Sequence, residues 1–367
     1  MIDSLDFLVS RKDLRRTRVA PQILTVNEGQ ALLQVERFAL TANNVTYAVF
    51  GDAMAYWKFF PLPDSLAEWG RVPVWGHAVV VESRHPDIAV GERVYGYLPM
   101  STHVVVQPDR ITAEGFVDSS AHRRPLPAPY QWYGRCAKDP MHVAGREDER
   151  ALLNPLFVTS FLIDDFFDDN GWFGAEQVVL ASASSKTALG VAFLAKPTVI
   201  GLTSPKNKSF CESLGYYDSV IPYDALAGLP KVPTVFVDMA GDGQLLASVH
   251  KHFADDLKYS CIVGATHWEH RETQHALPGA KPQFFFAPTQ AQKRRKDWGS
   301  GGLEQRFGVA WKNFLPSAAT WMQVRRASGQ QAVSDTWLEV LDGRASPTTG
   351  HILSFNAPAT GPSRTMG

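Results

Sequence analysis

The chain has 367 residues, 45% of them hydrophobic and 20% charged, a composition typical of a soluble globular protein with two domains. Its 36 Lys and Arg residues nearly balance its 37 Asp and Glu residues, for a formal net charge of −1, which does not favour a nucleic-acid partner. No apolar run approaches the ~18 residues of a membrane span, and the first residues lack the order of a signal peptide. We therefore expect a cytoplasmic protein with no membrane partner.

The first part of the chain is predicted to be rich in strands. Short apolar and β-branched runs bounded by Gly and Pro occur at 31–39, 73–83, 92–98 and 102–107, a spacing that indicates a barrel-like unit. Residues 114–150 are rich in Pro, Arg and polar side chains, and we expect a long loop or linker there.

From residue 151 the pattern alternates between strands and helices. Strands are predicted at 177–181, 197–203, 217–223, 234–239 and 259–264, and this alternation indicates a parallel sheet with helices on both faces. The tail from 301 is predicted as mixed structure whose last strand returns to the first domain. We thus expect one domain from 1–150 and 300–367, and a second from 151–299.

The segment between the first strand of this sheet and the following helix points to a phosphate site. Backbone N–H groups and the positive end of a helix dipole meet there. The G-x-G-x-x-G fingerprint is absent, but small and hydroxylated side chains leave room for a diphosphate and can donate to it. A plain polar turn fits this segment about equally well when it is taken alone. The candidate residues are Ser182, Ala183, Ser184, Ser185, Lys186 and Thr187.

The second strand of the sheet indicates which dinucleotide would bind. An acidic residue would bond the ribose of NAD at its end, but the sequence has none there, and Thr203, Ser204, Asn207 and Lys208 follow instead. Donors and positive charge suit the 2′-phosphate of NADP, although a solvated basic turn is the alternative. Further candidates lie where other strands end: Tyr223, which could instead close a turn, and Gly241, Gly264, Ala265 and Thr266.

Several segments in order resemble a known family. The runs GQALLQVERFALTANNVTYAVFG, PVWGHAVVVES, AVGERVYGYLP and STHVVVQPDRI resemble the first domain of medium-chain dehydrogenase/reductases of the zinc-free quinone oxidoreductase type. The later run from AEQVVLASASSKTALGVAFLAK to CIVGATH looks like the Rossmann domain of that superfamily, in a subfamily whose glycine loop is replaced by serines. The resemblance implies an α/β protein: a GroES-like β-barrel substrate domain plus a doubly wound Rossmann domain. It also implies NADP as cofactor and a homodimer.

The departures from the family pattern argue against a metal. Gly76 and His77 match a Gly-His pair of the family, but Ala78 stands where glutamate is common. No cysteine lies near position 43, where zinc-dependent members carry a ligand, and the three cysteines form neither a CxxC pair nor a four-cysteine cluster. We therefore expect a metal-free protein in which His77 is structural.

Candidate catalytic groups lie in the aromatic segment after the first predicted strands. Tyr47 resembles the active-site tyrosine of the family, and its phenol would donate to the oxyanion that forms during reduction. Asn43 and Asn44 would orient substrate or ribose, and Tyr56 and Lys58 would line the pocket or donate a proton. The alternative is that the aromatic residues simply pack beneath the barrel.

The function that these features favour is metal-independent, NADPH-dependent reduction of an activated carbonyl, enone or quinone, with an apolar or aromatic small-molecule substrate. Two alternatives stay open. The replaced glycine loop also suits a catalytically inactive nucleotide-binding or regulatory protein. The same fold further permits a non-redox, lyase-like enzyme that retains the nucleotide.

Overall fold

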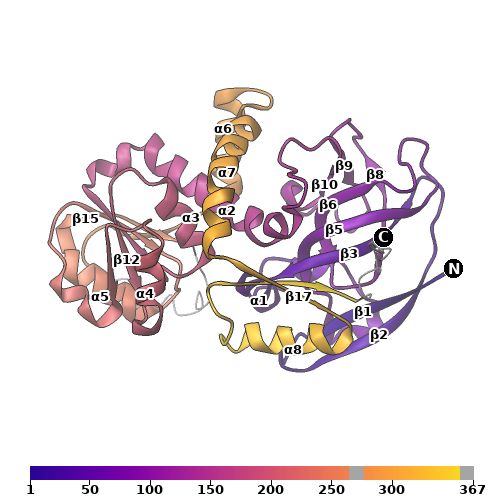
Figure 1. Ribbon diagram of the computed structural model, residues 1–367, viewed down its shortest axis with the longest axis horizontal. Helices are drawn as coiled ribbons and strands as arrows, with labels where there is room; N and C mark the ends of the chain where they lie inside the picture. Colours follow the sequence, from indigo (N-terminus) through magenta and orange to yellow (C-terminus); the bar gives the residue numbers. More distant parts are fainter. Residues whose placement is uncertain (264–276, 356–367) are drawn as a thin grey trace, which may run out of the picture. The chain divides into compact units, whose positions relative to one another are not determined.

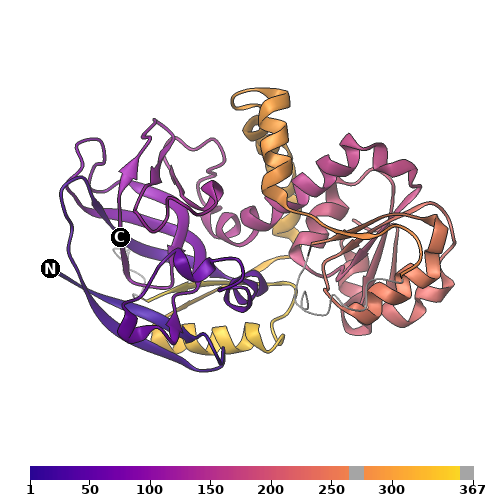
Figure 2. The same ribbon diagram turned by 180° about the vertical axis from the view of Figure 1, so that it is seen from behind.

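The computed structural model describes residues 1–263 and 277–355, and the chain divides into two compact units. The first, the barrel unit, comprises Met1–Leu152 and the chain from Met322 onward, and the second, the parallel-sheet unit, comprises Leu153–Trp321. Figures 1 and 2 show the elements of each unit from two sides. The sequence pattern predicts the return to the first unit near residue 300, whereas helix α7 (Gly302–Trp321) still belongs to the second.

The barrel unit is built on two sheets. A three-stranded sheet has the order β2-β1-β4, and a larger sheet has the order β17-β18-β3-β5-β6-β10-β9-β8, with β7 also paired to β3. The strands are β1 (Ile2–Ser10), β2 (Thr17–Leu24), β3 (Ala31–Leu40), β4 (Trp69–Gly70), β5 (Pro73–Ser83), β6 (Arg93–Pro99), β7 (His103–Val106), β8 (Pro108–Asp109), β9 (Gly115–Asp118), β10 (Trp132–Arg135), β17 (Gln323–Ser328) and β18 (Thr349–Ser354).

Helical segments of the barrel unit connect these strands. Helix α8 lies between β17 and β18, which pair in parallel, and β18 then pairs antiparallel with β3. Figure 1 shows α8 in yellow alongside β17. The helical segments are α1 (Ala42–Val49), η1 (Tyr56–Lys58), η2 (Asp64–Leu66), η3 (Ala128–Tyr130) and α8 (Gln330–Leu341).

The expectation of a loop over 114–150 is wrong in part, because β9 and β10 lie within that segment. Arg123 is fully buried and donates to Asp118 at 3.0 Å and to the Tyr133 hydroxyl at 2.9 Å. A buried charge needs such a partner. The polar composition of the segment does not indicate that Asp118 and Arg123 pair with each other. The polar residues therefore belong to a structured part of the barrel.

Strands β5 and β6 pair with a register that puts Gly76 opposite Gly96. A Cβ on Gly76 would lie 2.3 Å from the Arg37 carbonyl oxygen, and one on Gly96 would lie 2.5 Å from the Tyr133 ring. Both glycines are required by close packing on that face. The residues on either side of them project from the opposite face.

The parallel-sheet unit has the strand order β13-β12-β11-β14-β15-β16. Numbered from one within the unit, this order is 3-2-1-4-5-6, the order that dinucleotide-binding sheets share, and all its pairs are parallel. The strands are β11 (Gln177–Ala181), β12 (Thr198–Thr203), β13 (Ser219–Pro222), β14 (Thr234–Asp238), β15 (Leu257–Ile262) and β16 (Pro282–Phe284).

Both faces of this sheet are covered by apolar packing. Val178 and Leu180 of β11 pack in one cluster, which includes Phe167 of α2, and the intervening Val179 packs in another with Val249 of α5. Alternation of this kind is what a sheet buried on both faces requires. The parallel-sheet unit is therefore the doubly wound Rossmann sheet that the sequence predicts. The helical segments are α2 (Glu147–Asp169, which begins in the barrel unit), η4 (Gly171–Gly174), α3 (Lys186–Leu194), α4 (Pro205–Ser213), η5 (Tyr223–Gly228), α5 (Gly243–Phe253), η6 (Ala254–Asp256), α6 (Ala287–Trp298) and α7.

Among the residues that the structure describes, none of the helices has the length and apolar character of a membrane span.

Trp337 of α8 anchors the barrel core, and its loss should destabilise the protein. Its side chain is fully buried and its indole N–H donates to the Leu14 carbonyl at 2.8 Å. We expect Trp337→Ala to lower the free energy of unfolding by about 3–5 kcal/mol, because truncation leaves a cavity and an unpaired carbonyl. Chemical denaturation followed by circular dichroism measures this loss. The half-exposed Trp132 provides the control: Trp132→Ala should cost under about 1 kcal/mol, and equal losses for both variants would contradict the assignment.

Candidate functional site

Four phenols gather on one face of the barrel unit, where they form the tyrosine cluster (Tyr47, Tyr56, Tyr97 and Tyr130). The Tyr47 ring centroid lies 4.5 Å from that of Tyr56, 5.7 Å from that of Tyr97 and 6.4 Å from that of Tyr130. They come from α1, η1, β6 and η3, so the barrel fold brings together residues more than eighty positions apart in the chain. The cluster is buried and apolar apart from its hydroxyls.

Tyr47 is placed as a hydrogen-bond donor. The Asn43 amide nitrogen, one helical turn earlier, donates to the Tyr47 oxygen at 2.7 Å, which leaves the phenolic O–H to donate elsewhere. Burial raises the pKa of Tyr47 well above its usual value, the nearby Tyr130 adds to that rise, and Trp75, Asn43 and Tyr97 partly offset it. Tyr47 therefore keeps its proton at neutral pH.

Two further buried donors adjoin this hydroxyl. The indole nitrogen of Trp75 and the hydroxyl of Tyr97 approach the Tyr47 hydroxyl closely enough to lower its pKa, but neither makes a well-formed hydrogen bond within the described residues. The two rings lie 5.1 Å apart. Burial also raises the pKa of Tyr56 to about 12. A buried donor without a partner costs free energy, so this pair marks a place where an acceptor of a ligand would be stabilised.

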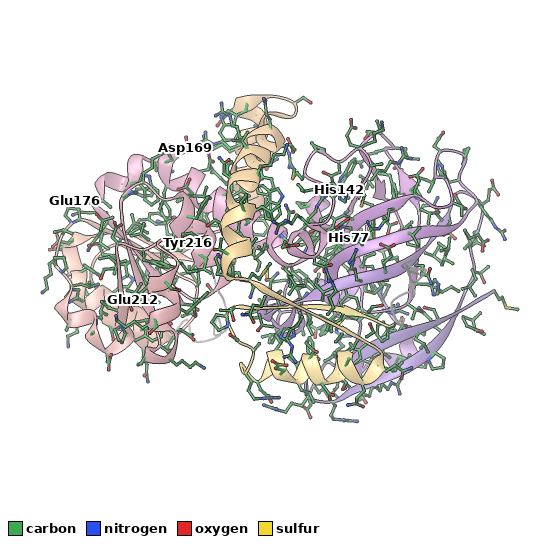
Figure 3. The ribbon with its side chains drawn as sticks, viewed as in Figure 1. His77, His142, Asp169, Glu176, Glu212 and Tyr216 are labelled. Atoms are coloured by element: carbon green, nitrogen blue, oxygen red, sulfur yellow. The ribbon has the colours of Figure 1, made fainter. Side chains whose placement is uncertain are left out.

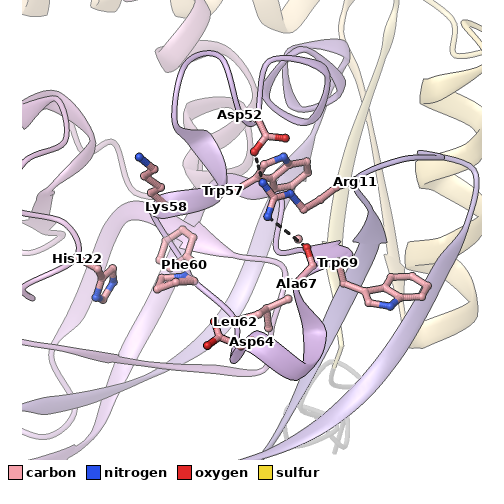
Figure 4. Close-up of a pocket in the computed structure, with 13 residues that line it drawn as sticks. Arg11, Asp52, Trp57, Lys58, Phe60, Leu62, Asp64, Ala67, Trp69 and His122 are labelled. Carbon is pink, nitrogen blue, oxygen red and sulfur yellow. Dashed lines mark hydrogen bonds and ion pairs between the residues drawn. The ribbon is translucent and has the colours of Figure 1, made fainter.

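The other two catalytic candidates from the sequence lie elsewhere. The Asn44 oxygen accepts from the Thr41 N–H at 2.7 Å and its amide donates to the Pro73 carbonyl at 3.0 Å, so Asn44 caps α1 and its side chain is already satisfied. Lys58 lines a separate pocket of about 380 Å³ in the barrel unit, together with Trp57, Phe60, Arg11 and His122 (Figure 4). Only Tyr47, Asn43 and Tyr56 of the predicted catalytic set thus come together.

In the parallel-sheet unit, the loop between β11 and α3 carries the predicted serines. Ser182 has a positive φ of 54°, a conformation that glycine usually supplies. Ser185 caps α3, its hydroxyl accepting from the Ala188 N–H at 3.3 Å. Ala183 is buried, and its carbonyl accepts from the Tyr217 hydroxyl at 2.7 Å. Lys186 and Thr187 begin the helix.

The two predicted cofactor loops meet at the carboxyl edge of the sheet. Asn207 of α4 donates to the Ser184 hydroxyl at 3.0 Å, and β11 and β12 are adjacent and parallel. Thr203 is buried at the end of β12, and Ser204 occupies the N-cap position of α4 without a capping bond from its side chain. Lys208 lies on the exposed face of α4, paired with Glu212. Ligands of open parallel sheets bind at this edge.

Two polar groups at this edge suit an anion. Desolvation in its partly buried position lowers the pKa of Lys186 to about 8, so the amine gains from a negative partner. The buried Ser204 hydroxyl has no hydrogen-bond partner within the described chain. Together with the N-termini of α3 and α4, these residues fit the diphosphate of a dinucleotide.

The remaining cofactor candidates lie on the same side or outside the described residues. Burial raises the pKa of Tyr223, and a hydrogen bond with the Ser182 backbone opposes that rise. Gly241 has a positive φ of 66°, and its N–H donates to the Asp238 carboxylate at 3.0 Å. Gly264, Ala265 and Thr266 fall within 264–276, outside the described residues.

A third group of side chains in the barrel unit was not predicted. The nitrogen and sulfur atoms of His77, Cys136 and His142 lie within 4.8 Å of one another. Burial lowers the pKa of both histidines and raises that of the Cys136 thiol. The expected structural role of His77 would need a hydrogen bond, but neither of its nitrogens has a partner in the described chain. The only sequence signal was the spacing of Cys136 and His142, six residues apart.

Solved structures share the two-unit fold. CurA from Vibrio vulnificus is 13% identical, with a TM-score of 0.61 over 97% of this chain and 99% of that one. CurA in complex with NADPH from Vibrio vulnificus is also 13% identical, with a TM-score of 0.59 over 96% of this chain and 100% of that one. The quinone oxidoreductase from Coxiella burnetii is 13% identical, with a TM-score of 0.57 over 96% of this chain and 99% of that one. At 13% identity these likenesses show that this chain shares the two-unit fold of these structures.

The sequence comparisons give the family. No curated protein matches this sequence significantly. Residues 38–346 match the model of a family described as "Protein of unknown function (DUF2855)", a span that includes the tyrosine cluster, both cofactor loops and α8. The chain therefore belongs to the DUF2855 family.

Proposed function

We propose that this protein is an NADPH-dependent reductase of an activated carbonyl, enone or quinone, and that the reduction step requires no metal. The observation that carries the proposal is the set of buried donors around Tyr47, two of which make no well-formed hydrogen bond within the described residues. The 3-2-1-4-5-6 sheet and its anion-suited edge support the cofactor assignment, as does the fold shared with CurA in its complex with NADPH. In this proposal the serine-rich loop binds the dinucleotide diphosphate in place of the usual glycine-rich loop.

NADPH, when bound, supplies a hydride to the substrate carbon. The rest of the reaction depends on the chain's own side chains. As the hydride arrives, negative charge develops on the carbonyl oxygen, and donors already fixed in a water-poor site stabilise it. Tyr47 is held by Asn43 to donate there, with Trp75 and Tyr97 as further donors. Because burial keeps the phenol protonated, Tyr47 acts as a donor and an acid, not as a base.

The cofactor is held by the edge of the parallel-sheet unit. Ser182 to Thr187 and the N-terminus of α3 would bind the diphosphate, with Lys186 supplying charge. Ser204, Asn207 and Lys208 would bind the 2′-phosphate, for which hydroxyls, an amide and an amine are suitable donors. The apolar rings of the tyrosine cluster suit an apolar or aromatic substrate. The homodimer is an expectation from the resemblance, and the cytoplasmic location is an expectation from the sequence pattern.

Substitution of Tyr47 tests the chemical step. We expect Tyr47→Phe to lower kcat for NADPH oxidation by about 10²–10³-fold, the usual cost of one oxyanion donor, while the Kd for NADPH is unchanged. A spectrophotometric assay with quinones and α,β-unsaturated ketones measures both the wild type and the variant.

Tyr259→Phe is the matched control, since the Tyr259 hydroxyl lies in the other unit at 3.3 Å from Gln283. It should leave kcat unchanged, as should dialysis against a chelator. Unaltered turnover in Tyr47→Phe would overturn the assigned donor. Tight NADPH binding without turnover of any substrate would favour the catalytically inactive alternative.

The identity of the dinucleotide is tested at Lys208. We expect Lys208→Ala to raise the Kd for NADPH at least roughly tenfold and to leave the Kd for NADH within about twofold, because only NADPH carries the 2′-phosphate. Fluorescence titration measures both. Lys196→Ala is the control, since Lys196 is exposed and pairs with Asp168. Equal losses for the two nucleotides would contradict the assignment.

The shifted pKa of Lys186 predicts a pH dependence of nucleotide affinity. Below pH about 8 the amine is protonated and attracts the diphosphate, and above that pH the free protein loses the charge. The Kd for NADPH should therefore be constant below pH about 8 and rise at least about tenfold above it. Lys186→Arg should bind equally well across this range, and Lys186→Gln should bind weakly throughout. The same pH profile in Lys186→Gln would assign the dependence to another group.

A further inference from the structure

The His77, Cys136 and His142 group lies where three neighbouring strands come together. His77 is on β5, and the N–H of Cys136, just after β10, donates to the Arg93 carbonyl of β6 at 2.9 Å. β6 lies between β5 and β10 in the sheet. Figure 3 labels His77 and His142 in this part of the barrel unit. The barrel fold itself therefore sets the positions of two of the three side chains.

Three of the four ring nitrogens of this group have no hydrogen-bond partner in the part of the chain that the structure describes. His77 is fully buried, and neither Nδ1 nor Nε2 has a hydrogen-bond partner among the described residues; the same is true of the buried Nδ1 of His142. Buried polar atoms are nearly always satisfied. Three unpaired nitrogens beside a buried thiol indicate that a bound species is part of the complete site.

The second nitrogen of His142 lies near the kind of group that accompanies a metal ligand. His142 Nε2 is 3.9 Å from Glu147 Oε1, longer than a hydrogen bond, and its buried Nδ1 has no hydrogen-bond partner in the described chain. Metal-binding histidines characteristically turn their second nitrogen to a carboxylate. The turn that carries His142 is also ordered, because its N–H donates to the Asp139 carbonyl at 3.0 Å and the Asp139 N–H donates to that of Arg135 at 2.9 Å.

The arginines near the group are paired with carboxylates. Arg93 pairs with Glu36 at 2.6 Å and with Glu147 at 3.3 Å, and Arg150 pairs with Asp139 at 2.5 Å. Each of these guanidinium groups therefore has a carboxylate partner that offsets its charge, and Arg37 likewise pairs with Asp148 at 3.2 Å. Burial is the main cause of the lowered pKa of His77, and Arg150, Arg93 and Arg37 still lower it further. A Cys136 thiolate would add a further negative charge.

We propose that His77, Cys136 and His142 bind a divalent transition-metal ion. Two imidazoles and one thiolate suit zinc, and three protein ligands leave a fourth position for water or another small ligand. Ligand atoms of a tetrahedral zinc ion lie ~3.3–3.8 Å apart at bond lengths of ~2.0–2.3 Å, which small side-chain rotations reach from the observed separations. The His142 side chain is 16% exposed and gives the ion access. The sequence analysis led us to expect a metal-free protein, and the sequence pattern did not connect these three ligands, so the proposed site differs from that expectation.

Cobalt titration of the whole protein tests this site without nucleotide or substrate. The protein is reduced, freed of metal with a chelator and titrated with Co²⁺. We expect one equivalent to give visible tetrahedral bands and a near-ultraviolet thiolate-to-cobalt charge-transfer band, both lost on adding Zn²⁺. Cys136→Ser should lose the charge-transfer band. Glu147→Gln should keep the band and weaken Co²⁺ binding by about 10–100-fold, the usual effect of removing a group that orients a metal ligand.

The controls separate this site from other metal-binding groups. Cys261→Ala removes a buried thiol of the parallel-sheet unit and should leave the titration unchanged. His142→Gln, on a partly exposed turn, should fold normally by circular dichroism and bind Co²⁺ more weakly than Glu147→Gln. Absence of a charge-transfer band in the wild type, or its persistence in Cys136→Ser, would overturn the site. Because no nucleotide is present, either result leaves the reductase proposal to its own assay.

Discussion

The pairing of β5 with β6 is the constraint on which the barrel unit's chemistry depends. Its register sets Trp75 opposite Tyr97 and His77 opposite Tyr95, with Gly76 opposite Gly96 between them. Because side chains alternate along a strand, one face of this pair carries the aromatic and imidazole groups while the other carries glycines that permit close packing. A slip of one residue would exchange the two faces and would remove both groups of functional side chains at once.

The face that this register creates holds two groups of different chemistry side by side. The Trp75 ring lies 5.7 Å from that of Tyr95, and Tyr95 lies 5.2 Å from His77, so Tyr95 lies between the donors of the tyrosine cluster and the proposed metal ligands. The Arg150 guanidinium lies 4.2 Å above the Tyr95 ring and is paired with Asp139. Tyr95 and Arg150 therefore separate the donors of the tyrosine cluster from the proposed metal ligands.

The parallel-sheet unit shows how a dinucleotide edge can be built with serines. Ser182 adopts the backbone conformation that a glycine would supply, and Ser185 satisfies the first turn of α3 with its own hydroxyl. The Asn207 side chain donates a hydrogen bond to Ser184 and so links α4 to the loop between β11 and α3. Hydroxyls and an amine thus occupy positions where other sheets expose bare backbone, and in the proposed function they would donate directly to the bound anion.

Local sequence patterns determined the alternation of strands and helices, the parallel sheet and the position of the serine loop, because these depend on residue periodicity and on the residue types directly after each strand. The resemblance to a known family, and not a local pattern, singled out Tyr47 and Asn43, one helical turn apart. Only the tertiary structure decided that Tyr97 and Tyr130 join Tyr47, that Asn44 is used as a helix cap, and that β9 and β10 order a segment predicted to be a loop. It alone brought His77 to Cys136 and His142, since long-range strand pairing, not local propensity, decides which distant side chains share a face.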